Sequence, residues 1–347
     1  MISQQIRSPA ILSMLSEFDI IRTCFEQEGL AAIPGDSVIQ GIGDDCALIK
    51  VPANKMLAFS MDTLVEDIHF PATAAPGLVA SRALAVNLSD LAATGAKPLV
   101  FTLGLTIPEA NQPWLEAFAA GLKAMAKEFN CYLIGGDMSR GALTITIQVQ
   151  GLVDDGQAIL RSGACPGDRI YITESLGCAA LALLMFEGKL NDVLPEEHEI
   201  INLAFYRPQP RIDAALTVAG LVSAGIDISD GLLADLGHIC EQSKCSATLN
   251  LTQIPLHPLV EKHLGRAAGL SKALSAGDDY ELILTVSAAQ ESLFLDAVSV
   301  LPEKFTCIGE ITEHNEAHKV SCIDENGSMV SSTRADAGGY MHFQGDD

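Results

Sequence analysis

The chain has 347 residues, with 21 Lys or Arg against 44 Asp or Glu, and its formal net charge is −23 at pH 7. Proteins that coat nucleic acid or an anionic membrane present a basic face, so this balance argues against both classes. Hydrophobic residues make up 48% of the chain and charged residues 19%, which excludes an acidic disordered protein. The length is sufficient for two globular domains.

Cysteine usage indicates the cellular compartment. None of the nine cysteines forms a C-x-x-C pair, so neither a zinc ribbon nor a thiol redox motif is indicated. Reduced cysteines in apolar surroundings are typical of cytoplasmic proteins. Residues 1–19 are too polar for a secretory signal, and no run approaches the ~18 apolar residues that span a membrane. We therefore expect a cytoplasmic protein that has no membrane and no nucleic-acid partner.

Helices and strands alternate in the first half of the chain. Helical spacing or amphipathic patterning predicts helices over residues 11–30, 78–95 and 113–129. A loop followed by a strand is expected over 35–51. Apolar runs predict further strands over 56–62, ending at Asp62, over 98–108, and over 131–134, stopping at the GGD that follows. Strict alternation of apolar and polar residues predicts a half-buried strand over 143–153.

A domain boundary is predicted near residues 154–168, which combine an acidic turn with glycines and a proline. Beyond it we expect strands over 169–173, 281–286 and 305–311, and a helix over 176–188. The segment 215–245 is predicted to form a helix, a short strand, a tight turn at 229–231 and a second helix. The fold class is thus α/β or α+β, in domains spanning 1–153 and 154–347.

Aspartates beside glycines or at the ends of predicted strands are the strongest chemical signal. A single Gly-Asp pair is usually explained by turn formation or helix capping. Asp90, however, lies among Ala and Leu in a predicted helix, where an unpaired carboxylate costs several kcal/mol. With few Lys and Arg in the chain, a divalent cation is the simplest partner, and oxygen ligands favour Mg²⁺.

Standard nucleotide-binding motifs are missing. The pattern G-x-x-x-x-G-K-[ST] is absent, which excludes a P-loop enzyme. Residues 41–46 begin like G-x-G-x-x-G but lack the third glycine, and Asp44 and Asp45 would repel a pyrophosphate. The protein-kinase motifs are missing as well.

Taken in order, the short motifs of the chain resemble those of the thiamine-monophosphate kinase family. They are residues 41–47 (GIGDDCA), 60–65 (SMDTLV) with 69–70 (HF), 85–93 (AVNLSDLAA), 135–137 (GGD), 161–164 (RSGA), 226–232 (IDISDGL) and 279–282 (DYEL). The resemblance covers essentially the whole chain. It implies a two-domain aminoimidazole ribonucleotide synthase-like fold with mixed sheets flanked by helices. It also implies a homodimer that pairs through the N-terminal domains.

The activity that the resemblance implies is the ATP-dependent phosphorylation of thiamine monophosphate to thiamine diphosphate, the final step of thiamine diphosphate biosynthesis. Direct in-line transfer with several Mg²⁺ ions is expected, with ATP as co-substrate. The implied metal ligands are Asp45, Ser60, Met61 through its backbone, Asp62, Asp90, Asp137, Asp227 and Asp230. The implied nucleotide contacts are Gly136, Asp137, Arg161 and Ser229, and the implied substrate contacts are His69, Asp278 and Ala337. Among these residues, Asp45, Asp230 and Arg161 are expected to be catalytic.

Three positions depart from the family pattern. Asp278 stands where Glu is usual, Met61 where many members have Thr, and Ala337 where a bulky aromatic residue often occurs. Other enzymes of the superfamily remain alternatives: selenophosphate synthetase, a hydrogenase-maturation protein and aminoimidazole ribonucleotide synthase. A non-enzymatic acidic protein that binds metal or nucleotide is the alternative from a different class.

Overall fold

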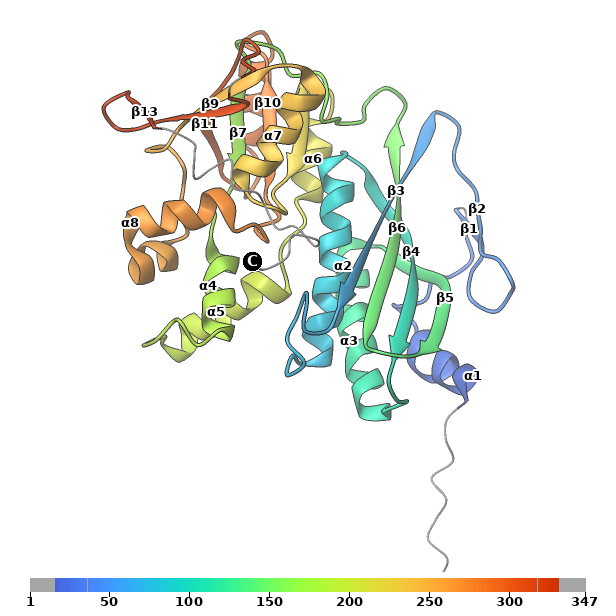
Figure 1. Ribbon diagram of the computed structural model, residues 1–347. Coiled ribbons are helices and arrows are strands. Elements are labelled where there is room, and N and C mark those ends of the chain that lie inside the picture. Colours follow the sequence, from blue (N-terminus) through green and yellow to red (C-terminus); the bar gives the residue numbers. More distant parts are fainter. Residues whose placement is uncertain (1–15, 36, 317, 331–347) are drawn as a thin grey trace, which may run out of the picture.

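Two large mixed sheets organise the computed structural model, which describes residues 16–35, 37–316 and 318–330 (Figure 1). The N-terminal sheet has the strand order β3-β6-β4-β5; β4 and β5 are parallel and the other neighbours antiparallel. Its strands are β3 (Lys55–Val65), β4 (Lys97–Ile107), β5 (Tyr132–Arg140) and β6 (Thr144–Asp154). The expected fold class, α/β with mixed sheets flanked by helices, is confirmed.

The alternating pattern predicted over 143–153 is confirmed in β6. Ile145, Ile147 and Val149 are fully buried, whereas Thr144 and Thr146 lie on the opposite, partly exposed face. The buried face is covered by α2 (Pro76–Ala93) and α3 (Gln112–Phe129), which pack against each other (Figure 1). One face of this sheet therefore faces the core, and its other face combines polar residues of β6 with the exposed Phe59 and Met61 of β3.

The two covering helices begin and end at residues suited to these positions. Pro76 occupies the first turn of α2, where its missing N–H costs nothing. The Asn111 side chain accepts a hydrogen bond from the backbone N–H of Trp114 (3.1 Å) at the start of α3, and Asn130 ends that helix in the left-handed conformation. Leu84 and Leu88 of α2 are fully buried, each contributing about 1.5–3 kcal/mol relative to exposure.

Two strands are longer than the sequence predicts. We expected a strand to end at Asp62, but β3 continues to Val65 and pairs with β6 throughout. We expected another to stop before Asp137, but β5 runs through Gly135–Asp137 to Arg140. A Cβ at Gly136 would lie 1.9 Å from the Leu103 carbonyl oxygen, so glycine here permits close pairing instead of ending the strand.

The C-terminal sheet has the order β13-β12-β9-β11-β7-β10-β8, in which only β12 and β9 are parallel neighbours among the described residues. Its strands are β7 (Arg169–Thr173), β8 (Ala224–Asp227), β9 (Ser246–Asn250), β10 (Leu282–Val286), β11 (Phe305–Thr312), β12 (Val320–Ile323) and β13 (Met329–Val330). The helices of this domain are α4 (Cys178–Phe186), α5 (Pro195–Tyr206), α6 (Ile212–Val218), α7 (Leu232–Ser243), α8 (Pro258–Ser275) and α9 (Glu291–Val298). The position of the domain boundary at residues 153 and 154 stays a prediction.

The start of the described chain forms a short helix, α1 (Glu17–Ile20), which continues into a π-helical turn over Ile21–Phe25. The predicted helix over 11–30 is thus confirmed over residues 17–25; residues 26–30 are not helical, and residues 11–15 lie outside the described residues. Two short strands, β1 (Val38–Gln40) and β2 (Leu48–Ile49), pair with each other, and the loop between them carries Asp45.

Helix α2 is shared by the two domains. One side of it packs on the N-terminal sheet, and it also contacts α5, α6 and β8 of the C-terminal domain (Figure 1). An ion pair between Arg207 and Glu128 adds a second tie between the domains. No helix in the described ranges is both long and apolar enough to cross a membrane.

Candidate active site between the domains

A cavity of about 850 Å³, here called the interdomain cleft, lies between β3, α2 and loops of the C-terminal domain. A smaller cavity of about 300 Å³, the side cavity, shares Asp90 and Asp227 with it. The predicted site residues that line the cleft are Met61, Asp62, His69, Asp90, Asp227, Ser229, Asp230 and Asp278. Ser60 and Arg161 line the side cavity. The structure therefore brings together ten of the predicted residues, from both domains.

Asp62 and Asp90 face each other from β3 and α2. The Ser60 hydroxyl donates to Asp90 Oδ2 (2.5 Å), and the backbone N–H of Asp62 donates to Asn87 Oδ1 (3.0 Å). Burial raises the pKa of Asp62 to about 6, and the nearby charge of Asp90 adds to the shift. Burial also raises the pKa of Asp90, against the opposing effects of the Ser60 hydroxyl and the Arg161 charge.

Asp227 ends β8 and is 3% exposed. Its carboxylate accepts a hydrogen bond from the hydroxyl of Ser89 (2.6 Å), a residue of α2 in the other domain. Burial raises the pKa of Asp227 well above its ordinary value of 3.8, and the charge of Asp90 raises it further. Two carboxylates from different domains therefore repel each other in a desolvated place, which an added cation would relieve.

The turn after β8 is held by Asp235, a residue that sequence reasoning missed. Its Oδ2 accepts hydrogen bonds from the backbone N–H groups of Ser229 (3.0 Å), Asp230 (3.0 Å) and Gly231 (3.1 Å). Burial, followed by the charge of Asp230, raises the pKa of Asp235 to about 7. Asp230, Asp235 and His238 each have one potential ligand atom, and these three atoms lie within 4.8 Å of one another. The available signal was the S-D-G-L-L-A-D spacing, which places Asp235 in the first turn of α7.

Another part of the cleft wall combines His69, Asp278 and aromatic rings. The backbone N–H of Val65 donates to Nδ1 of His69 (3.0 Å). Arg82, a second residue that sequence reasoning missed, donates to Asp278 Oδ1 (2.5 Å). Phe205 lines the same wall.

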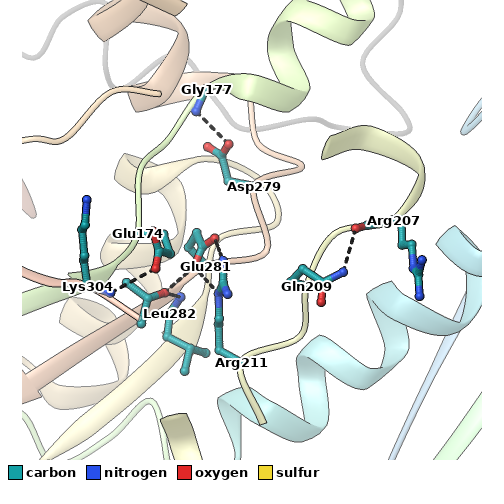
Figure 2. A network of polar contacts seen from close by, with 10 residues as sticks. Glu174, Gly177, Arg207, Gln209, Arg211, Asp279, Glu281, Leu282 and Lys304 are labelled. Atoms are coloured by element: carbon teal, nitrogen blue, oxygen red, sulfur yellow. Dashed lines mark hydrogen bonds and ion pairs between the residues drawn. The ribbon is translucent and has the colours of Figure 1, made fainter. Parts of the chain in front are cut away.

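The segment that carries Asp278 is anchored in the C-terminal domain by its other acidic residues (Figure 2). The backbone N–H of Gly177 donates to Asp279 Oδ1 (2.7 Å). Arg211 donates to both carboxylate oxygens of Glu281, at 2.7 Å and 2.5 Å, and the Thr173 hydroxyl donates to the same group (2.5 Å). Asp279 and Glu281 therefore serve the fold, and Asp278 is the acid of this segment that lines the cleft.

Three other predicted residues, Asp45, Gly136 and Asp137, line a different cavity of about 790 Å³, here called the outer cavity. It lies beside α1 and the edge strand β5, and both its predicted carboxylates are exposed to solvent. The single chain therefore separates the predicted ligands into two groups. The predicted substrate contact Ala337 lies outside the described residues.

The donor atoms of the cleft suit a hard divalent cation. They are carboxylate and hydroxyl oxygens, and three of the carboxyl groups have raised pKa values because they are desolvated near one another. Among the described residues, the positive charges that act on these groups come from Arg82 and Arg161. Because Arg82 is already paired with Asp278, the cluster has a net negative charge when its carboxyl groups are ionised, and a bound cation would balance that charge.

Two family models match the chain: the AIR synthase related protein N-terminal domain over residues 43–153 and the corresponding C-terminal domain over 165–320. The thiamine-monophosphate kinase of Escherichia coli K12 is 39% identical over 327 residues, which cover 94% of this chain and 98% of that protein. The thiamine-monophosphate kinase of Bacillus subtilis is 32% identical over 337 residues, covering 95% of this chain and all of that protein.

Solved structures give the same result. The crystal structure of thiamine-monophosphate kinase from Stenotrophomonas maltophilia is 40% identical, with a TM-score of 0.77 over 83% of this chain and 91% of that chain. The structure of AaThiL complexed with AMPPCP and TMP is 27% identical, with a TM-score of 0.72 over 87% of this chain and 92% of that chain. The hydrogenase-maturation protein HypE of E. coli, at 17% identity and a TM-score of 0.71, shares the fold.

Proposed function

Because the chain belongs to the thiamine-monophosphate kinase family, we propose that it transfers the γ-phosphoryl group of ATP to thiamine monophosphate, giving thiamine diphosphate and ADP. This reaction is the final step of thiamine diphosphate biosynthesis. The complex of AaThiL with AMPPCP and TMP supports the choice of ligands. The observation that carries the proposal is the cluster of desolvated carboxylates, Asp62, Asp90 and Asp227, beside a cleft of about 850 Å³.

We assign several Mg²⁺ ions to this chemistry. The proposed ligands in the cleft and side cavity are Ser60, the backbone of Met61, Asp62, Asp90, Asp227 and Asp230, and those in the outer cavity are Asp45 and Asp137. Bound Mg²⁺ supplies the neutralisation of the two polyanionic reactants that any phosphoryl transfer requires. Asp45 and Asp230 are the carboxylates that we propose to be catalytic.

The donor nucleotide contacts other groups of the chain. Arg161 is exposed at the side cavity, so its guanidinium is accessible to a bidentate contact with a phosphate of ATP. Ser229 stands on the turn whose backbone N–H groups donate to Asp235, and we assign its hydroxyl a contact with the nucleotide. Gly136 and Asp137 provide the nucleotide contacts of the outer cavity.

The acceptor phosphate needs orientation more than activation. A phosphate monoester has a second pKa of about 6, so it is already an anion near neutral pH and no general base is required. The hydrogen bond from Val65 to Nδ1 of His69 places the ring proton on Nε2, which donates to the acceptor phosphate. We propose direct in-line transfer between the two bound phosphates, without a phospho-enzyme. Asp278 binds the thiamine moiety, and the place of Ala337 stays a prediction.

A homodimer through the N-terminal domains is part of the proposal. Strand β3 lies at the edge of its sheet, and its Phe59 and Met61 side chains are 67% and 59% exposed. An exposed apolar edge strand is a surface for pairing with another chain. Sedimentation velocity tests this point: we expect a dimer for the unmutated protein and a monomer for Phe59→Asp, whereas a monomeric unmutated protein contradicts the assignment.

An assay with ATP, Mg²⁺ and thiamine monophosphate tests the activity, with thiamine diphosphate and ADP separated by chromatography. We expect equal amounts of the two products and none of either when Mg²⁺ is replaced by EDTA. Production of ADP only with selenide or an aminoimidazole precursor would assign the chain to another enzyme of the superfamily. Binding of ATP without turnover of any of these substrates would support the non-enzymatic alternative.

A further inference from the structure

Arg82 is a charged residue in the buried part of α2, with an exposed fraction of 5%. Its Nη1 donates to the backbone carbonyl of Phe205 (2.7 Å), and its Nη2 donates to Asp278 Oδ1 (2.5 Å). The guanidinium carbon also lies 3.8 Å from the centre of the Phe205 ring, a cation–π contact. One side chain of the N-terminal domain thus fixes two elements of the C-terminal domain at the wall of the cleft.

Asp278 occupies a backbone segment whose conformation is strained. Asp278 and Tyr280 adopt positive φ angles of 63° and 51°, a conformation that costs residues other than glycine on the order of 1 kcal/mol or more each. The segment is secured to the turn that carries Ser229: the backbone N–H of Asp278 donates to the Ser229 carbonyl (2.9 Å). A Cβ at Gly277 would lie 2.2 Å from that same carbonyl, so the two segments touch through their backbones.

The carboxylate of Asp278 therefore has its two oxygens in different situations. Both hydrogen bonds that the described side chains make to it, from Arg82 and from the Tyr280 hydroxyl (3.3 Å), use Oδ1. Oδ2 is the oxygen left to accept a hydrogen bond from a ligand in the cleft. Because the charges of Arg82 and Asp278 balance, this corner of the cleft selects a neutral N–H or O–H donor.

We propose that Arg82 is a positioning residue for the acceptor substrate: it holds Asp278 so that Oδ2 accepts a hydrogen bond from an N–H group of the aminopyrimidine ring of thiamine monophosphate. The inference rests on the proposed function and deepens it. It also explains how Asp278, with a side chain one methylene shorter than Glu, serves this place. The short side chain of Asp278 is held by the long side chain of Arg82, which extends from the N-terminal domain.

A simpler alternative is that Arg82 only ties the domains together. The chain offers a matched control for it, because the ion pair of Arg207 with Glu128 also joins the domains but does not touch Asp278. If the loss of any ion pair between the domains weakens the binding of the acceptor, Arg207→Gln and Arg82→Met will have the same effect. If Arg82 acts through Asp278, only the second substitution will weaken the binding of the acceptor.

The test is steady-state kinetics with thiamine monophosphate and ATP varied separately, for Arg82→Met, Arg82→Lys, Asp278→Asn, the double variant Arg82→Met/Asp278→Asn and Arg207→Gln. We expect Arg82→Met to raise KM for thiamine monophosphate about 10- to 100-fold, as for the loss of a charged hydrogen bond, with a smaller change in kcat and no change in KM for ATP. Arg82→Lys should restore part of the loss. In the Asp278→Asn background, Arg82→Met should add less than about 3-fold, because coupled residues are not additive.

Other outcomes would contradict either the positioning role of Arg82 or the proposed function. Additive effects of Arg82→Met and Asp278→Asn, an equal rise in both KM values, or a rise of the same size in Arg207→Gln overturns the positioning role. An unchanged KM for thiamine monophosphate in Arg82→Lys and Arg82→Met overturns it as well. Should Arg82→Met fail to fold, the cycle with Arg82→Lys decides in the same way. Absence of thiamine diphosphate with the unmutated protein contradicts the proposed function itself.

Discussion

The interdomain cleft and the outer cavity contain carboxylates of the same implied set in opposite physical settings. Asp90 and Asp227 in the cleft accept hydrogen bonds from serine hydroxyls and have raised pKa values because they are desolvated. Asp45 and Asp137 in the outer cavity are exposed to water. A bound cation would therefore stabilise the ionised aspartates of the cleft strongly and those of the outer cavity only weakly.

This difference separates what the structure explains from what the family resemblance implies. A buried carboxylate pair is unfavourable unless a cation balances it, so the cleft by itself argues for a metal ion. An exposed carboxylate is stable in water without any partner, and the role of Asp45 depends on ligands that bind beside it. The two groups should therefore respond differently to substitution.

The largest expected effect is on turnover at the cleft. Asp230→Asn keeps the shape of the side chain and removes its charge, so we expect kcat to fall about 100- to 1000-fold, as for other groups that stabilise developing charge. The fold should be intact by circular dichroism, because Asp230 is only partly buried. A kcat close to that of the unmutated protein at saturating Mg²⁺ would contradict the assignment of Asp230 as a catalytic carboxylate.

At the outer cavity, Asp45→Asn should lower kcat/KM by a smaller factor, about 10- to 100-fold. Its effect should appear only in activity, and the midpoint of thermal unfolding in EDTA should stay unchanged because the carboxylate is exposed. Full activity in this variant, measured beside Asp230→Asn, would show that the outer cavity takes no part in the reaction.

Without metal, substitution of a cleft carboxylate should stabilise the protein, whereas substitution of an outer-cavity carboxylate should have no effect on stability. Burial raises the pKa of Asp227 to about 8, and Asp227→Asn removes the ionised form that burial disfavours, so we expect Tm measured in EDTA at pH 9 to rise by about 2–4 °C. Asp137→Asn is the matched control, and it should leave Tm unchanged since its side chain is exposed. A lower Tm for Asp227→Asn would mean that the ionised carboxylate stabilises the fold even without a cation.

The smallest effect is the dependence of stability on pH. The pKa values of Asp62 and Asp235 rise from 3.8 to about 6 and about 7, so the folded protein binds these protons more tightly than the unfolded chain. This contribution is complete below about pH 4 and is lost as the pH rises through 6 and 7. Tm in EDTA should therefore fall between pH 4 and pH 7, more steeply in the unmutated protein than in Asp62→Asn. Identical slopes would contradict the raised pKa of Asp62.

Local patterns predict local structure well in this chain. The alternation over 143–153 gives the correct buried face of β6, since each residue reports its own surroundings. The same logic fails at Gly136, because glycine usually ends a strand and here permits close pairing of β5 with β4. An isolated segment does not reveal which neighbour it will approach.

Local sequence patterns do not predict contacts between residues that are distant in sequence. The apolar surroundings of Asp90 predicted correctly that its carboxyl group needs a partner, but the meeting of Asp90 with Asp227 depends on how α2 packs against β8. Arg82 was missed because its partners Phe205 and Asp278 are 123 and 196 residues away in sequence. Its position among alanines and leucines was the one available signal of burial.

Calorimetric titration with Mg²⁺ in the presence of AMPPCP tests the central claim, that the cleft carboxylates hold the cation, most directly. The unmutated protein should bind Mg²⁺ with saturation, and Asp227→Asn should bind it at least about 10-fold more weakly, as expected for losing a charged ligand. Equal affinity for Mg²⁺ in the two proteins would contradict the account.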